Sequence, residues 1–522
     1  MSKQNQSQIY RARDIPSDFP KTYDVVVVGS GAGGASAAQI LAESGLSVLI
    51  LEQGPYRTNK DFSLLEKDTY ADLYQDVAAR KTKDKGITIL QGRSVGGSTT
   101  VNWTSSFRTP QPVIQHWINE HGLKEFANDE LAPWFDQVHE DLSIKKWALP
   151  PNENNKVLLS GCETLGFHTE VIPRNVNGCA NLGYCGFGCP INAKQSMLVT
   201  AIPAAIKAGA NLLSRAMVAQ LTIQNNEVQG VEIQALDQYG RPANQSVIKI
   251  TARHVILSAG AIGSPAVLLR SQATDPYKQI GKRTFLHPVV GTAAIMSQIV
   301  DGFQGAPQSI YSDHFLWRDG VAGDLGYKLE VPPLHPSLTS SIVPGFGNNH
   351  RNVMKKYRHL QSIIALLRDG FHPEDVGGDV SLDSNNLPVL DYPLRKHFWQ
   401  AALHSLEMMA SIQFAAGAKV VIPVHQRGTP SRSMSDFKKQ ISELPLRASQ
   451  MGIFSAHVMG GCAMGADPES SVVKADGRAH HLENLSIMDG SVLPTSLGVN
   501  PQVTLYSLVR RNTHALIKHL IR

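Results

Sequence analysis

The chain has 522 residues, of which 42% are hydrophobic and 18% charged, a composition typical of a globular protein with a large buried core. Its net charge of +5 is small for this length, and the absence of any basic cluster interleaved with aromatic residues excludes nucleic acid as an expected partner. No apolar run is long enough for a membrane span, and the polar N-terminus lacks a signal-peptide pattern. We therefore expect a cytoplasmic protein, with peripheral attachment to a membrane as the alternative.

The first predicted elements form a βαβ unit. Residues 1–20 are expected to be a loose arm. A strand at Tyr23–Val28 then leads through a glycine-rich turn into an alanine-rich helix over 31–43. A second strand follows at Ser47–Leu51. This order predicts a parallel sheet.

The middle and the end of the chain differ from this first unit in residue composition and in the elements they predict. A helix is predicted over 194–208, and the extended runs that begin at Asn211–Val218 suggest an antiparallel meander. Strand, glycine turn and helix recur in HVILSAGAIGSPAVLL, residues 254–269. Residues 300–450 are rich in proline, histidine and aromatic residues and contain an amphipathic helix at His397–Phe414, which suggests a region that faces the substrate. A final helix is predicted at Gln502–Leu520.

The glycine turn after the first strand has the spacing GxGxxG, at Gly29, Gly31 and Gly34. It opens a helix, and Glu52 ends the next strand, which is the context of a dinucleotide site. The turn would bring a diphosphate to the helix N-terminus, where free N–H groups and the helix dipole favour an anion. Glu52 would accept hydrogen bonds from an adenosine ribose. A glycine-rich turn without a ligand is the alternative, and the pattern does not separate FAD from NAD.

Five further segments resemble glucose–methanol–choline (GMC) oxidoreductases and follow the order of motifs in that family. They are GRSVGGSTTVN (92–102), GAIGSPAVLLRS (260–271), HVMGGCAMG (457–465), IMDGSVLP (487–494) and GVNP (498–501). Gln272 replaces the glycine that usually ends the second motif. Segments 327–338 and 185–195 are similar to the long-chain (fatty) alcohol oxidase branch, and GVNP to the cholesterol oxidase branch, which suggests a bulky or lipophilic alcohol.

The resemblance implies an α/β fold, with a Rossmann-type FAD-binding domain that holds a parallel sheet and a β-meander, and a discontinuous α+β substrate domain. We expect the FAD-binding domain over 21–110, 195–290 and 452–522, and the substrate domain over 111–194 and 291–451. Val101 lies where some relatives attach FAD through a histidine, so noncovalent FAD is expected. The expected cofactor-binding residues are Gly29, Gly31, Ala32, Gly33, Gly34, Glu52, Arg93, Gly96, Gly97, Ser98, Asn102, Val218, Asp489, Asn500 and Pro501. For Asp489, a turn-capping role is the alternative.

The resemblance also identifies a catalytic pair, His457 and Asn500. An alcohol gives up hydride readily only if its hydroxyl proton also leaves, so a general base is required, and histidine suits this role near neutral pH. His457 is the expected base, and Asn500 would orient the substrate oxygen. The alternative is that His457 is merely structural. His287 is expected to support the flavin domain, and Cys462 to pack in the core.

Three of the five cysteines, Cys179, Cys185 and Cys189, lie close together in the sequence, and Pro190 follows the last. Their spacing resembles the iron–sulfur segment of some GMC sugar dehydrogenases, which predicts a 3Fe–4S cluster as a second cofactor. Packed thiols and a single disulfide are the alternatives, and zinc is disfavoured because no fourth ligand is nearby.

The sequence thus predicts an FAD-dependent enzyme that oxidises an alcohol to a carbonyl by hydride transfer to the flavin. If the cysteines hold a cluster, the electrons would pass to a cytochrome or a quinone rather than to oxygen. An oxygen-using alcohol oxidase, a flavoprotein of another class such as a lyase or photoenzyme, and a redox-inert binding module are the alternatives. The last two would not need His457 and Asn500.

Overall fold

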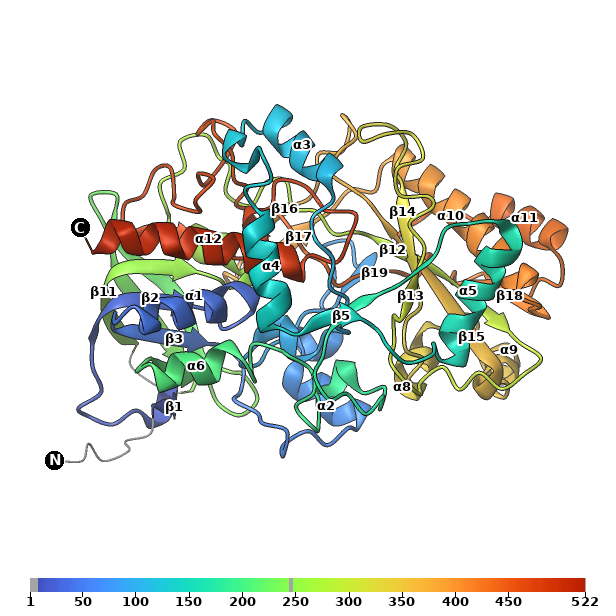
Figure 1. The fold of residues 1–522 in the computed structure, drawn as a ribbon, viewed down its shortest axis with the longest axis horizontal. Coiled ribbons are helices and arrows are strands. Elements are labelled where there is room, and N and C mark those ends of the chain that lie inside the picture. Colours follow the sequence, from blue (N-terminus) through green and yellow to red (C-terminus); the bar gives the residue numbers. More distant parts are fainter. Residues whose placement is uncertain (1–7, 244–246, 522) are drawn as a thin grey trace.

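The computed structural model describes residues 8–243 and 247–521, which form two sheets with helices around them (Figure 1). The first sheet has a parallel part, in which β1, β8, β3, β2 and β11 lie side by side, and an antiparallel part, in which β10 and β9 follow β11. A short strand, β20, pairs in parallel with the C-terminal end of β11. Its strands are β1 (Ile9–Arg11), β2 (Thr22–Val28), β3 (Val48–Glu52), β8 (Asn211–Ser214), β9 (Ala216–Gln224), β10 (Glu227–Ala235), β11 (Ile248–Leu257) and β20 (Leu485–Ile487).

This arrangement confirms the predicted α/β fold with a parallel sheet and a meander. The buried strand β2 carries valine at four successive positions, all 5% exposed or less, as expected for a strand that is covered on both faces. Helix α1 packs against α6 and α12 beside this sheet. The surrounding helices are α1 (Ala32–Glu43), α3 (Gln111–Glu120), α4 (Ala132–Asp141), α6 (Ala201–Lys207), α7 (Gly260–Arg270) and α12 (Gln502–Leu520).

The second sheet lies beside the first, and the long helix α10 packs on it. Its strand β12 is central, with β15 on one side and both β18 and β19 on the other. The strands are β4 (Ile87–Ile89), β12 (Val289–Ile295), β14 (Tyr327–Glu330), β15 (Leu360–Leu367), β18 (Val420–Pro423) and β19 (Ile453–Ser455). The helices of this half are α5 (Glu153–Leu165), α8 (Pro336–Ile342), α9 (Gly347–Met354), α10 (Lys396–Ala415) and α11 (Met434–Glu443).

The remaining elements are short. Helix α2 (Glu66–Leu73) lies between the two halves of the molecule in Figure 1. Three two-stranded ladders complete the fold: β5 (Ile144–Lys146) with β7 (Pro173–Asn175), β6 (Glu170–Val171) with β13 (Ile310–Tyr311), and β16 (Asp379–Leu382) with β17 (Pro388–Asp391).

Two expectations about elements are wrong in part. Residues 1–7 of the expected loose arm lie outside the described residues, but Ile9–Arg11 form β1, because the free edge of β8 offers backbone partners at Leu212–Ser214. The helix expected over 194–208 begins only at Ala201. The buried ammonium of Lys194 is held by three backbone carbonyls, and this anchors the chain outside helical geometry before α6.

The division into two domains stays a prediction. Strands β4 and β19 come from segments that we assigned to the FAD-binding domain, yet they pair with each other and extend the second sheet through β12. The two halves are therefore joined by shared strands at the place where the site described below is formed.

Candidate active site

A cavity of about 610 Å³ runs along the carboxyl end of the parallel sheet, where ligands bind in open α/β sheets. Its volume falls within the range of about 300–1,000 Å³ that is usual for cofactor and small-molecule sites. Most of the predicted site residues line it: Gly29, Gly31, Ala32, Gly33, Glu52, Arg93, Gly97, Ser98, Asn102, Val218, His457, Asp489, Asn500 and Pro501. Sequence segments hundreds of residues apart thus meet around one space.

The glycine turn between β2 and α1 is held in place by Glu52. One carboxylate oxygen accepts from the Ser30 backbone N–H at 3.1 Å and from the Ser30 hydroxyl at 2.6 Å, and the other accepts from the Gly54 N–H at 2.7 Å. Burial raises the pKa of Glu52, and these hydrogen bonds oppose that shift. The Ser30 hydroxyl oxygen in turn accepts from the Gly96 N–H at 3.1 Å, which ties the two glycine-rich motifs together.

Gly34 and Gly96 do not line the cavity, and they act in packing instead. A Cβ atom at Gly34 would lie 1.9 Å from the Gly29 carbonyl oxygen, so helix α1 can approach β2 only without a side chain there. Gly96 has a φ of +90°, which favours glycine. In contrast, a Cβ atom at Gly31 would meet nothing closer than 3.9 Å, so the backbone of the turn borders open space.

Unpaired polar atoms in the cavity wall show that the site fits a polar cofactor. Nε of Arg93 and Oδ1 of Asn102 are buried and have no hydrogen-bond partner among the described residues, although both residues line the cavity. Buried polar groups are normally paired, so a ligand in this space would satisfy them. Together with the glycine cradle at the N-terminus of α1, these atoms suit the diphosphate and sugar groups of FAD.

Both carboxylate oxygens of Asp489 accept hydrogen bonds from other residues of the chain. One oxygen accepts from the Gly260 N–H at 2.8 Å and the Ser264 hydroxyl at 2.5 Å, and the other accepts from the Ser491 N–H at 2.8 Å and the Ser491 hydroxyl at 2.5 Å. Burial raises its pKa. The carboxylate therefore joins the start of α7 to the C-terminal segment beside the cavity, while a role toward a ribityl hydroxyl stays a prediction.

His457 and Asn500 lie together in the cavity wall, with Nε2 of the imidazole 3.4 Å from Nδ2 of the amide. Burial and the positive charge of Lys328 lower the pKa of His457 to about 3. The imidazole is therefore uncharged at neutral pH, as a base must be before it accepts a proton. The geometry agrees with the predicted pairing, and the catalytic roles stay predictions.

A buried ion pair that the sequence analysis did not assign lies behind Asn500. Nζ of Lys328 is 3.1 Å from Oε1 of Glu330, and neither side chain is exposed to solvent. Lys328 also donates to Oδ1 of Asn500 at 3.3 Å, while Nδ2 of Asn500 lies 3.5 Å from Oε2 of Glu330. The ion pair fixes the orientation of the amide, so that Nδ2 faces His457. In the sequence, this pair could have been recognised from two opposite charges, two residues apart, within an otherwise apolar strand.

His287 holds the other side of His457. Nε2 of His287 accepts from the backbone N–H groups of Leu497 and Gly498, at 3.3 and 2.8 Å, so its proton lies on Nδ1, 3.3 Å from Nδ1 of His457. Both ring nitrogens of His457 thus face donors. Nε2 can take a proton only in the tautomer with hydrogen on Nδ1, and in that tautomer two N–H groups would face each other, so the 3.3 Å contact with His287 would have to lengthen. The predicted supporting role of His287 is consistent with its complete burial.

The predicted iron–sulfur cluster finds no support. Cys179, Cys185 and Cys189 form no disulfide, and among the described residues they do not make up a group whose ligand atoms all lie within 4.8 Å of one another, as around a single metal ion. The segment is held in place by a buried lysine. The buried Lys194 donates to the carbonyls of Cys185 and Asn102, at 2.7 and 3.1 Å, and so fixes the cysteine segment against the cavity wall.

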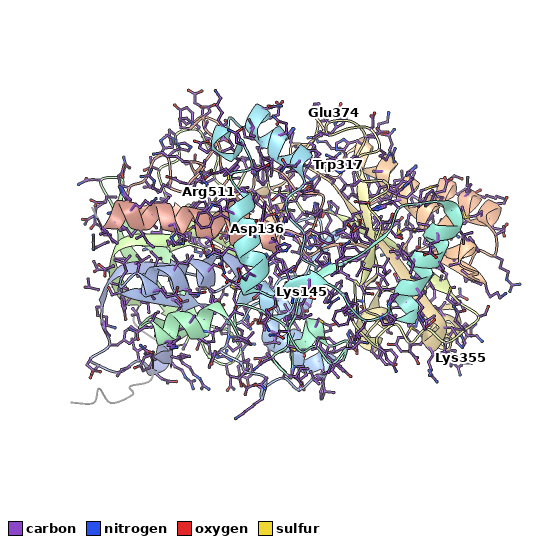
Figure 2. All side chains as sticks on the ribbon, in the orientation of Figure 1. Asp136, Lys145, Trp317, Lys355, Glu374 and Arg511 are labelled. Atoms are coloured by element: carbon purple, nitrogen blue, oxygen red, sulfur yellow. The ribbon has the colours of Figure 1, made fainter. Side chains whose placement is uncertain are left out.

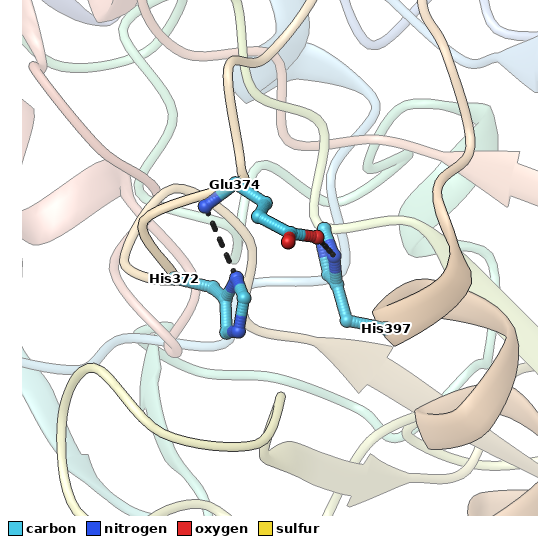
Figure 3. A group of neighbouring side chains, drawn as sticks. All are labelled: His372, Glu374 and His397. Carbon is cyan, nitrogen blue, oxygen red and sulfur yellow. Dashed lines mark hydrogen bonds and ion pairs between the residues drawn. The ribbon is translucent and has the colours of Figure 1, made fainter.

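Another group of candidate metal ligands, His372, Glu374 and His397, lies outside the cavity (Figure 3). The two imidazole rings are stacked with their centres 4.7 Å apart and their planes 20° apart. A metal ion lies in the ring plane of each histidine that binds it, and two stacked planes share no such point. Nδ1 of His372 also accepts from the Glu374 N–H at 3.1 Å. This arrangement therefore does not form a metal centre.

Comparison with known protein families gives three matches along the chain. The N-terminal domain of GMC oxidoreductases matches residues 70–289, and the C-terminal domain matches residues 373–508. An FAD binding domain matches residues 24–64, which contain the glycine turn and Glu52.

Among curated proteins, the chain is 31% identical to the long-chain-alcohol oxidase FAO4A of Arabidopsis thaliana, over 93% of this chain and 67% of the relative. It is 30% identical to an uncharacterized GMC-type oxidoreductase of Mycobacterium tuberculosis, over 93% of this chain and 74% of the relative. Among solved structures, pyridoxine 4-oxidase from Mesorbium loti is similar, with a TM-score of 0.71 at 18% identity, over 95% of this chain and 99% of the other. This last likeness shows the fold.

Proposed function

This chain belongs to the GMC oxidoreductase family, and we propose that it oxidises a lipophilic alcohol with FAD as its noncovalent cofactor. The observation that carries the proposal is the single cavity that joins the glycine turn of the FAD binding domain to His457 and Asn500. When bound, FAD accepts the hydride that leaves the alcohol carbon. The residues of the chain bind the cofactor, position the alcohol and take its proton.

The proton of the alcohol would pass to Nε2 of His457, and Nδ2 of Asn500 would donate a hydrogen bond to the substrate oxygen. The 3.4 Å between these two nitrogens allows one oxygen atom to contact both of them. Negative charge grows on that oxygen as the proton leaves, and a fixed donor stabilises it at this stage. Lys328, which holds the amide, adds a positive charge behind the donor.

Two observations support a lipophilic substrate. The curated relatives include several named long-chain-alcohol oxidases. In addition, four apolar side chains that line the cavity pack together as a cluster of their own, namely Val289, Ile364, Leu366 and Phe454. The electron acceptor stays a prediction, for which we expect a cytochrome or a quinone. Comparing peroxide formation under air with the reduction of a soluble quinone tests whether oxygen or a quinone takes the electrons.

The replacement His457→Ala tests the catalytic assignment. We expect bound flavin to remain, while the rate of flavin reduction by alcohol falls by ~10²–10⁴-fold, as is usual for the loss of a general base. Asn500→Ala should lower the rate less, because this residue orients the oxygen and does not take the proton. Rapid mixing without oxygen measures both rates. A His457→Ala rate within a few-fold of wild type would remove this residue from the role of base.

Noncovalent attachment is tested separately by acid precipitation. Val101 presents an alkyl side chain to the cavity and has no atom that could bond to the flavin. The yellow colour should therefore pass entirely into the supernatant. Colour that stays in the protein pellet would contradict noncovalent binding.

A further inference from the structure

The stretch between Glu330 and Asp369 contains no acidic residue, although it carries several arginine and lysine residues. Three of them, Arg351, Lys355 and Lys356, are exposed and form no ion pair among the residues that the structure describes. The fourth cation before β15, Arg358, is neutralised by Asp301 at 2.7 Å. Helix α9 and the turn after it therefore present a local excess of positive charge on a chain whose overall charge is small.

Apolar side chains protrude beside these cations. Phe346, at the start of α9, is 90% exposed, and Ile342, at the end of α8, is 40% exposed. Among the described residues no other large hydrophobic side chain reaches the exposure of Phe346. Leaving an aromatic ring in water is unfavourable, so a protruding ring at the start of a helix that carries unpaired cations indicates a surface with a partner.

Helix α2 contributes to the same edge of the molecule. The Glu66 carboxylate accepts from the backbone N–H groups of Ser337 and Leu338, at 2.6 and 2.9 Å, and thereby joins the start of α2 to the start of α8. The neighbouring Leu65 is 53% exposed. Figure 1 shows α2, α8 and α9 along one edge, and Figure 2 labels Lys355 there. Glu66, the carboxylate that contacts this segment, is thus already occupied by N–H donors.

We propose that the α8–α9 surface, defined by Ile342, Phe346, Arg351, Lys355 and Lys356, docks on an anionic lipid bilayer. Phe346 and Ile342 enter the boundary between headgroups and acyl chains, while the three cations contact anionic headgroups. A projecting aromatic tip with flexible cations around it fits a soft, negatively charged plane. Among the described residues, no helix combines the length and the apolar character needed to cross a membrane, so attachment through this surface would be peripheral.

A row of aromatic contacts links this surface to the cavity. His335, which precedes α8, lies 4.4 Å from Phe187 between ring centres; Phe187 lies 6.0 Å from Tyr70, and Tyr70 lies 5.4 Å from Tyr74, which lines the cavity. Docking through α8–α9 would place the bilayer on the side of the molecule from which this row of rings leads to the cavity wall. The docking inference itself does not depend on the proposed activity.

The test is sedimentation of the FAD-loaded full chain with lipid vesicles. Vesicles of phosphatidylcholine with phosphatidylglycerol should bind the protein, vesicles of phosphatidylcholine alone should bind it much more weakly, and added salt should weaken the binding. Each basic residue near an anionic surface strengthens binding by about five-fold. The double variant Lys355→Gln/Lys356→Gln should therefore bind at least ten-fold more weakly, and Phe346→Ser several-fold more weakly.

Matched controls distinguish this surface from a general effect of charge. Arg432→Gln/Lys439→Gln removes two exposed cations at and before α11 that form no ion pair among the described residues, and Tyr239→Ser removes another exposed aromatic ring, which is 69% exposed. These controls should bind within two-fold of wild type, and all variants should retain their flavin spectrum. Absence of binding to anionic vesicles would overturn the proposal, as would an equal loss of binding in the control variants.

Discussion

At the residue scale, the buried Lys328 ammonium holds the Asn500 amide, to which we assign the positioning of the substrate oxygen. It lies between Glu330, Asn500 and the ring of Phe107, whose centre is 3.0 Å from Nζ. Burial lowers the pKa of Lys328 to about 8, and Glu330 opposes this shift. The group is therefore charged at neutral pH, at the cost of desolvation, and its charge fixes the direction of the Asn500 amide.

The variant Lys328→Met should be destabilised by about 3–5 kcal/mol, because it leaves the buried Glu330 carboxylate without its cationic partner. The double variant Lys328→Met/Glu330→Gln should recover most of that stability. It should still reduce flavin about 10–100-fold more slowly than wild type, since a charged hydrogen bond contributes about 1.5–3 kcal/mol. Thermal unfolding and the rate of flavin reduction measure the two effects. A double variant with the wild-type rate would show that Lys328 serves stability alone.

The pH dependence of flavin reduction follows from the pKa shifts of His457 and Lys328. His457, with a pKa near 3, stays uncharged as pH falls to 5, so no loss of rate is expected between pH 7 and pH 5. Lys328 loses its proton as pH rises through about 8, and the rate should fall above that value. A profile of the reduction rate from pH 5 to pH 10 measures this. An acidic limb at pH 6–7 would contradict the buried, uncharged His457.

At the element scale, two glycines of the turn between β2 and α1 differ in role. Gly34 allows close packing, and Gly31 borders the cofactor cavity. Gly34→Ala would place Cβ 1.9 Å from a backbone oxygen, so we expect a loss of several kcal/mol of stability from overpacking. Gly31→Ala has space for its Cβ and an ordinary φ of −72°, so the fold should remain, while the methyl group enters the cofactor cavity and weakens FAD binding. Thermal unfolding and FAD titration distinguish the two. Equal stability of both variants would contradict the assignment.

Local elements were predictable, and distant pairings were not. The βαβ unit follows from a valine-rich strand, the glycine spacing and an alanine-rich helix, all within about thirty residues, and α12 was predicted with its bounds Gln502–Leu520. Strand β1 was missed because its short sequence carries no alternating pattern. Its stability comes from the edge of β8, two hundred residues away. The second sheet joins β4 to β19 in the same nonlocal way.

At the scale of the whole molecule, the candidate site was largely predictable because its residues lie in family motifs that assign an expected role to each position. His457, Asn500 and the glycine turn were placed in this way, and they line one cavity. Lys328 and Glu330 act through Asn500 and lie in no such motif, so only their opposite charges within an apolar strand could have marked them. The cysteine segment is a case in which spacing alone was a weak guide. Its spacing suggested a cluster that finds no support, while Lys194 fixes the segment against the cavity wall.

An anaerobic titration of the purified yellow protein with primary alcohols of increasing chain length tests whether the flavin in this cavity oxidises alcohols. We expect the yellow flavin colour to bleach with one equivalent of alcohol per flavin, and long-chain alcohols to act faster than short ones. Alkanes of matched length should leave the colour unchanged. A flavin that binds in the cavity and stays oxidised with every alcohol would contradict the claim that this cavity oxidises alcohols.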